Sequence, residues 1–173
     1  MSLEQLYISL GYTKSQFESI RNSYSNKNYN DDTFYKKTID IYNYFISLGL
    51  SRENFIKFSV SFPTVFSLSV NNINQKIAYF KEKFHLTSDD IKQIILSYSK
   101  VFTITPETIE EKTALFQSKG YKPSQIEKLF KNNAEIFALG IDNINSKFDF
   151  FLRLGFIPSN IIKITLDNSS VYT

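Results

Sequence analysis

Lysines recur at matching positions along this 173-residue chain, and phosphate binding is the chemistry that such a series could perform. Lys76, Lys112 and Lys147 each stand in the pattern Ile-x-x-Lys-x-x-x-Phe. Steps of three and four residues place the side chains of that pattern on one face of a helix. Two interpretations stay open. The ammonium groups form a ladder that neutralises successive phosphates, or each stem covers apolar surface while its ammonium reaches water.

A second series consists of Lys57, Lys128 and Lys163, each two positions after a residue of an apolar column. Two positions correspond to about 200° around a helix, so these lysines are expected to face solvent. A solvated face is the default interpretation of this series, and phosphate contact is the functional one. Under the functional interpretation, auxiliary contacts would come from Arg52, Lys122, Lys131 and Arg153.

Catalytic and metal chemistry find little support among the other residues. The sequence has no Cys and a single His, His85, which excludes thiolate ligands and multi-His metal sites. The carboxylate pairs are adjacent in sequence, and neighbouring side chains on a helix diverge instead of meeting at a substrate. These pairs are Asp31-Asp32, Asp89-Asp90 and Glu110-Glu111. We therefore predict a protein that is not an enzyme and that needs no cofactor or metal.

The lysines are set in a repeat of about 35 residues, which predicts the elements that position them. Five segments begin alike, with a turn residue at Gly11, Gly49, His85, Gly120 and Gly155. A β-branched residue followed by an aromatic recurs at Val65-Phe66, Val101-Phe102, Ile136-Phe137 and Val171-Tyr172. Each repeat is expected to hold a short α-helix, a 3₁₀-like turn around this pair, and a longer α-helix. The predicted fold class is an all-α helical-repeat solenoid, or superhelix.

The repeats divide the chain into segments of one continuous solenoid. A degenerate N-terminal repeat covers residues 1–47 and includes a long polar loop at residues 22–32. The regular repeats are expected at residues 48–83, 84–118, 119–153 and, as a partial unit, 154–173. Aromatic residues are expected mainly in the core, although the less periodic tyrosines Tyr24, Tyr29, Tyr35, Tyr42 and Tyr44 form a candidate partner surface.

The run from Leu48 to Phe84, LGLSRENFIKFSVSFPTVFSLSVNNINQKIAYFKEKF, resembles a repeat of the mitochondrial transcription termination factor (mTERF) family. The resemblance rests on the Leu-Gly start, the Pro before an apolar turn, the Ile-x-x-Lys step and the aromatic that follows it. It implies a superhelix whose concave face binds double-stranded DNA or structured RNA, in transcription or RNA metabolism, without catalysis. The six lysines of the two series are the nucleic-acid-binding candidates.

Charge leaves a second class of partner open. The net charge is only +3. Residues 84–118 carry three basic and five acidic side chains, so a basic track would be interrupted there. The alternative function is therefore a protein–protein interaction solenoid, an adaptor or a bacterial effector, with a protein partner at the open C-terminal repeat. An intracellular protein is expected, because neither a targeting segment nor a membrane-spanning run is visible; organelle and cytoplasm are not distinguished.

Overall fold

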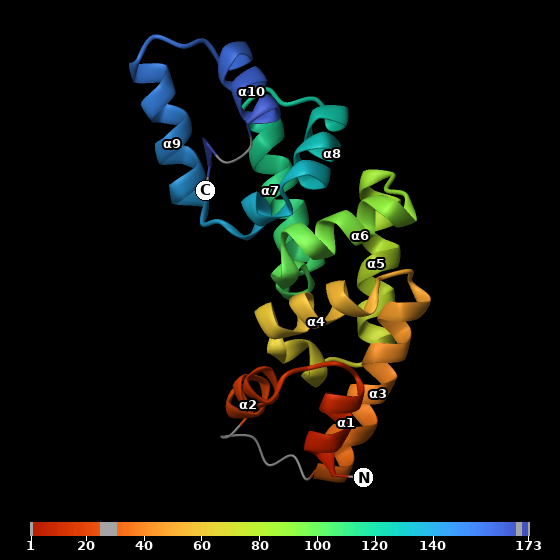
Figure 1. Cartoon of the computed structure of the whole chain (residues 1–173). Coiled ribbons are helices and arrows are strands. Elements are labelled where there is room, and N and C mark those ends of the chain that lie inside the picture. Colours follow the sequence, from red (N-terminus) through yellow and green to blue (C-terminus); the bar gives the residue numbers. More distant parts are fainter. Residues whose placement is uncertain (1, 25–30, 169–170, 173) are drawn as a thin grey trace. The chain divides into compact units, whose positions relative to one another are not determined.

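A computed structural model describes residues 2–24, 31–168 and 171–172 of the chain (Figure 1). These residues form ten α-helices and three 3₁₀ helices and contain no strand, so the all-α helical-repeat class is confirmed. Among the described helices, none combines the length and the apolar character that crossing a bilayer requires. The chain divides into two compact units, Met1–Ile77 and Ala78–Thr173, with the boundary inside α5, and each unit is described separately.

The first unit contains the N-terminal helices, in which α3 packs against α1, α4 and η1 (Figure 1). Its elements are α1 (Leu3–Ser9), α2 (Lys14–Asn22), α3 (Asp31–Ser47), α4 (Arg52–Ser61), η1 (Pro63–Ser67) and the first half of α5 (Val70–Phe84). The polar loop predicted at residues 22–32 is shorter than expected. Asn22 ends α2 and α3 begins at Asp31, so both ends of the predicted loop are helical. Residues 25–30 of that loop lie outside the described part.

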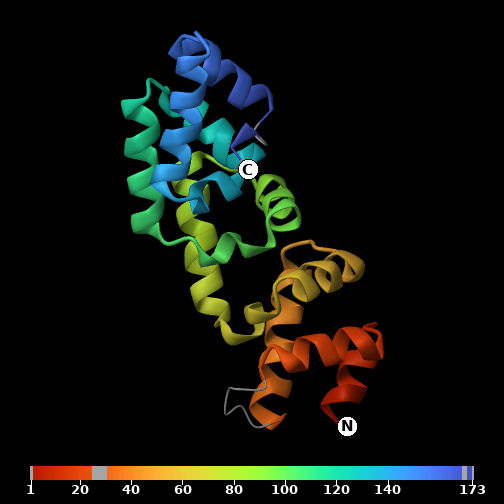
Figure 2. The ribbon, with the colours of Figure 1, turned by 90° about the vertical axis from the view of Figure 1, so that its left-hand side faces the viewer.

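The second unit repeats the order of short helix, 3₁₀ helix and longer helix that the sequence predicts (Figure 2). After the end of α5 come α6 (Ser88–Ser97), η2 (Ser99–Thr103), α7 (Pro106–Ser118), α8 (Pro123–Asn132), η3 (Ala134–Ala138), α9 (Ile141–Arg153) and α10 (Pro158–Asp167). Within this unit α8 packs against α6, α7, α10 and η3. The short helices of successive repeats therefore contact one another directly.

Local sequence explains where the helices begin and turn. The hydroxyls of Ser51 and Thr87 accept hydrogen bonds from backbone amides of the first turns of α4 and α6, each at 3.2 Å. Pro123 and Pro158 occupy first helical turns, where no N–H is needed. The turn column adopts left-handed backbone conformation, with φ near 90° at its glycines and φ 48° at His85.

Aromatic side chains fill both cores, as expected. In the first unit Phe45, Phe55 and Phe66 are buried, and in the second Phe84 stacks on Phe130 at 4.0 Å between ring centroids. Buried tyrosine hydroxyls pair with hydroxyls of the next repeat's short helix. These pairs are Tyr12 with Ser59 and Tyr121 with Thr165, both at 2.6 Å. Each pair joins elements more than 40 residues apart within a unit and gives both of its buried hydroxyls a hydrogen-bond partner.

Candidate nucleic-acid interface

Lys57, Lys128 and Lys163 are exposed, as the helical periodicity predicts. They lie at matching positions of the short helices α4, α8 and α10, where α6 has Gln93. Lys57 pairs with Glu53 one turn earlier at 2.8 Å, and both side chains are well exposed. Such a pair costs little to separate, because solvent screens it. All three ammonium groups can therefore reach an anion without any change in the packing of their helices.

The series on the longer helices is held more tightly. Lys112 on α7 is only 4% exposed, and its ammonium lies 3.3 Å from a carboxylate oxygen of Glu111. Lys147 on α9 is half-buried and donates a hydrogen bond to the backbone carbonyl of Tyr172, the aromatic residue of the Val171-Tyr172 pair in the following repeat. Lys76 on α5 is likewise half-buried. These stems cover apolar surface, and at Lys147 the charged head also links one repeat to the next.

The auxiliary basic residues divide between exposed positions and internal partners. Arg52 donates to the carbonyls of Ser9 and Leu10, where α1 ends, and its guanidinium fills the space that a side chain at Gly11 would need. Lys131 pairs with Asp90 at 2.7 Å. Lys122 and Arg153 are exposed. The role of Arg52 was missed from sequence, although an Arg opposite a helix C-terminus is a recognised way to satisfy the last carbonyls.

The acidic groups of residues 84–118 are engaged within the second unit. Asp90 accepts hydrogen bonds from Lys131 and from Thr87, and these hold the pKa of its carboxyl at about 2. Asp89 pairs with Lys92 at 2.6 Å, so the two neighbouring carboxylates face different partners. Glu110 is bonded by Lys83, at 2.7 Å, and by Tyr79, and both bonds lower its pKa. Each of these three carboxylates has a partner within the second unit, and of the three only Asp90 is buried.

The tyrosine surface considered from sequence is wrong for Tyr24. That side chain is buried, and its hydroxyl donates to the backbone carbonyl of Pro63. Tyr42 and Tyr44 are half-buried, and the ring of Tyr42 packs edge-on against Phe55 at 5.3 Å. Tyr29 lies outside the described residues. Burial prevents Tyr24 from stacking on a base, which needs an open ring face.

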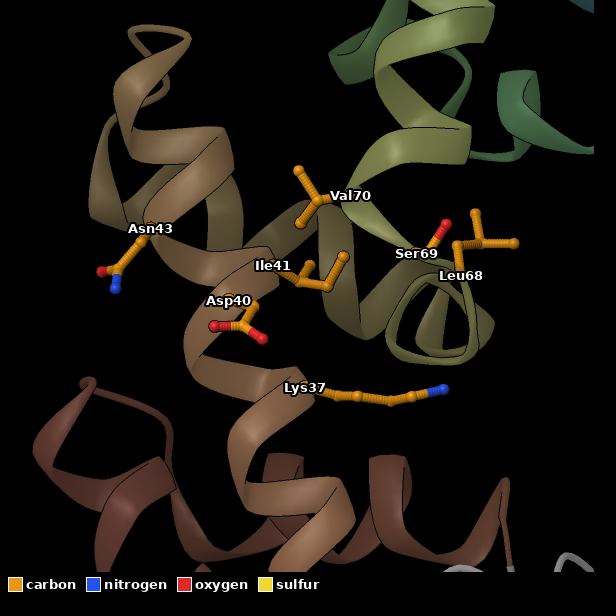
Figure 3. Close-up of a pocket in the computed structure, with 7 residues that line it drawn as sticks. All are labelled: Lys37, Asp40, Ile41, Asn43, Leu68, Ser69 and Val70. Carbon is orange, nitrogen blue, oxygen red and sulfur yellow. The ribbon is translucent and has the colours of Figure 1, made fainter.

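A cavity of about 480 Å³ opens in the first unit between α3 and the start of α5 (Figure 3). Lys37 and Ile41 extend from α3 toward the segment that holds Leu68, Ser69 and Val70. Asp40 also lines the cavity, so its charge offsets that of Lys37. The cavity therefore offers a largely apolar surface, without a net positive charge that would attract an anion.

The described residues contain no cluster of three or more His, Cys, Asp or Glu side chains that could hold a metal ion.

Comparison with protein families gives a clear result. The model of the mTERF family matches residues 6–86 and again residues 71–171, and the two matches overlap at residues 71–86. Together they cover almost the whole chain, including residues 6–47 of the segment where a degenerate repeat is predicted. A search of curated proteins found no match.

Proposed function

The chain belongs to the mTERF family, and on this premise we propose that it is a non-catalytic helical-repeat protein that binds double-stranded DNA or structured RNA. Transcription or RNA metabolism is the process in which such binding would act. The observation that carries the proposal is the family match over residues 6–171. It is supported by exposed lysines at the same position of three short helices, because phosphate contacts supply most of the affinity of proteins for a nucleic-acid backbone.

We rank the six candidate lysines for this role by the exposure of their side chains. Lys57, Lys128 and Lys163 come first, because their ammonium groups are exposed. Lys76 and Lys147 come second, because they are half-buried and Lys147 already has a carbonyl partner. Lys112 comes last, because a buried ammonium would have to leave its site to meet a phosphate.

Salt-dependent binding tests this ranking. The Lys57→Glu/Lys128→Glu/Lys163→Glu variant and wild type are titrated with a duplex DNA and a hairpin RNA at low salt. We expect at least a tenfold loss of affinity in the variant. The slope of log K against log salt should fall by about 2.7 for duplex DNA if three phosphate contacts are removed.

A matched control separates a local effect from general charge. Lys14, Lys36 and Lys100 are also exposed and stand outside both series. Changing them to Glu alters the net charge by the same amount, so this control variant should keep most of the affinity. Equal losses in the two variants would remove the exposed lysines as a specific site, and wild type that fails to bind either nucleic acid would overturn the proposed function.

Exposed apolar residues near the end of α9 favour a second candidate, a protein–protein interaction solenoid acting as an adaptor or effector. The acidic excess of residues 84–118 also suits this candidate, because it interrupts a basic track. A flat salt response in the binding experiment would favour it over the first.

A further inference from the structure

A second cavity, of about 220 Å³, lies inside the second unit where the end of α5 meets α7 and α8. We call it the α5–α8 pocket. Phe84 and Ile126, both almost completely buried, contribute apolar walls. Four side chains contribute polar groups to the lining, namely His85, Thr113, Gln117 and Glu127. None of the six candidate lysines lines this pocket, so it is a site distinct from the proposed nucleic-acid interface.

The next repeat has the same junction at the end of α7, and it shows what the pocket replaces. A glycine, a phenylalanine and an isoleucine of that junction stand where His85, Thr113 and Glu127 stand here. They are Gly120, Phe148 and Ile162. Ile162 would lie 3.8 Å from a Cβ atom at Gly120, and Phe148 is only 4% exposed. Apolar side chains thus fill the later junction, whereas the α5–α8 pocket departs from the repeat at three positions, each time toward a polar residue.

Two of these departures are unfavourable for the fold alone. His85 adopts φ 48°, in the left-handed region where the glycines of its column carry no penalty. Among the described residues, Oγ1 of Thr113 is the buried side-chain polar atom without a hydrogen-bond partner. Unfavourable features that collect around one cavity indicate a function there, because folding alone would remove them.

The charge of the pocket favours a cation. Oε1 of Glu127 lies 3.1 Å from Nδ1 of His85, and a histidine carries a charge only when protonated. In the neutral imidazole, Nδ1 donates its proton to this carboxylate, which leaves Nε2 as an acceptor. Lys83 also lines the pocket, but its ammonium is paired with Glu110 at 2.7 Å. The pocket is therefore rich in acceptors and holds a carboxylate without a full counter-charge.

We propose that the α5–α8 pocket binds a guanidinium group, carried by a small molecule or by an arginine side chain of a partner. Guanidinium is a planar cation with five N–H donors and no acceptor. These donors match the carboxylate of Glu127, Nε2 of His85 and the amide oxygen of Gln117. The hydroxyl of Thr113 can turn toward the ligand, because threonine divides between two rotamers in a helix. Guanidinium is also less strongly hydrated than ammonium, which suits a cavity with apolar walls.

The size and exposure of the pocket set the expected strength. Its volume admits a guanidinium group with a short methylene stem. The side chain of Glu127 is 32% exposed, so water screens its charge in part. A dissociation constant on the order of 0.1–1 mM is expected for the isolated group.

Two-dimensional amide NMR of the whole chain tests the proposal with propylguanidine as the probe. We expect shift changes concentrated at residues 83–85, 113–117 and 123–127. Propylurea has the same shape without the charge, and butylamine has the charge without the planar donors. Both should bind at least about tenfold more weakly than propylguanidine. Shifts scattered over other acidic residues, equal binding of either analogue, or no response to propylguanidine would overturn the proposal.

Variants of the lining residues test the assignment. Glu127→Gln keeps the shape of the side chain and should weaken binding at least about tenfold. The matched control Glu18→Gln removes an exposed carboxylate of α2 and should bind as wild type does. His85→Gly/Glu127→Ile gives the junction the residues of the next repeat, so it should unfold at no lower temperature than wild type and yet lose the probe. Wild-type binding by Glu127→Gln or by this double variant would contradict the site.

A capped peptide, Gly-Gly-Arg-Gly-Gly, distinguishes the two sources of the guanidinium group. If the pocket takes an arginine side chain of a partner, the peptide should bind at least as tightly as propylguanidine, because its backbone stays outside. If the pocket takes a small molecule, the backbone should clash at the entrance and the peptide should bind at least about tenfold more weakly. Either result supports a guanidinium site, and failure of both ligands to bind overturns it.

Discussion

Lys112 allows the structural and the functional interpretations of the repeated lysines to be separated in one experiment. Its side chain is 5% exposed, and its ammonium lies 3.3 Å from a carboxylate oxygen of Glu111, whose side chain is 55% exposed. Replacement by Met keeps the apolar stem and leaves Glu111 free to turn to water. We expect this change to alter the free energy of unfolding by no more than about 1 kcal/mol.

Replacement of Lys112 by Glu has a different expected cost. It buries a carboxylate without a counter-charge and beside a second carboxylate, which costs about 3–5 kcal/mol. For a chain of this length each kcal/mol corresponds to about 2–4 °C, so Tm should fall by roughly 6–20 °C. Thermal unfolding followed by far-UV circular dichroism measures both variants.

Duplex binding at low salt completes the test. We expect Lys112→Met to bind duplex DNA with nearly wild-type affinity, because the buried ammonium makes no phosphate contact. If both variants keep their Tm and lose affinity together, Lys112 faces the ligand and the reasoning from burial is refuted.

Three further predictions concern stability and are checked by the same unfolding measurement. Hydrogen bonds lower the pKa of Asp90 from 3.8 to about 2, so its carboxylate stabilises the fold above the unfolded pKa. The Asp90→Asn variant should therefore have a lower Tm than wild type at pH 6. The difference between the two Tm values should shrink as the pH falls from about 4 to about 2. A difference that does not depend on pH would contradict the ion pair. His85→Gly should raise stability by about 0.5–1 kcal/mol, because φ 48° is unfavourable for a side chain and the exposed contact to Glu127 is weak; a loss would show that this contact dominates. Ile157→Thr should add about 1 kcal/mol at low protein concentration by supplying the missing N-cap, and an unchanged Tm would argue against a cap at this position.

Much of the fold follows from the sequence, because local rules determine it. The turn column predicts turns at Gly49 and Gly120, and the structure gives both residues a left-handed backbone conformation. The Pro and hydroxyl residues predict helix starts, and the pair Val101-Phe102 predicts the 3₁₀ helix η2. These features depend on residues within one helical turn of one another, so packing with distant parts of the chain does not alter them.

The candidate site is less predictable, because burial depends on distant residues. Periodicity places Lys112 on the same face of its helix as Ile109 and Phe116. It places Lys57 on the solvent-facing side of its own helix. The structure confirms that Lys112 points toward the core and that Lys57 is exposed. How deeply Lys112 is buried depends on how other elements pack against α7, and periodicity carries no information about that distance. Arg52 shows the same limit, because its partners Ser9 and Leu10 precede it by more than 40 residues.

The buried hydroxyl pairs bear on how a chain of similar repeats avoids docking the wrong helices during folding. Tyr12 and Tyr121 meet Ser59 and Thr165, whereas the matching positions of the middle repeats hold Leu50 and Leu86, Ile95 and Phe130. If Tyr12 docked onto the helix meant for Leu86, its hydroxyl would be buried against an aromatic ring without a partner. An unsatisfied buried hydroxyl costs about 1–3 kcal/mol. The first and last of these inter-repeat contacts are thus polar and the ones between them are apolar. This difference favours docking of each helix on its correct neighbour, although the repeats share the same apolar columns.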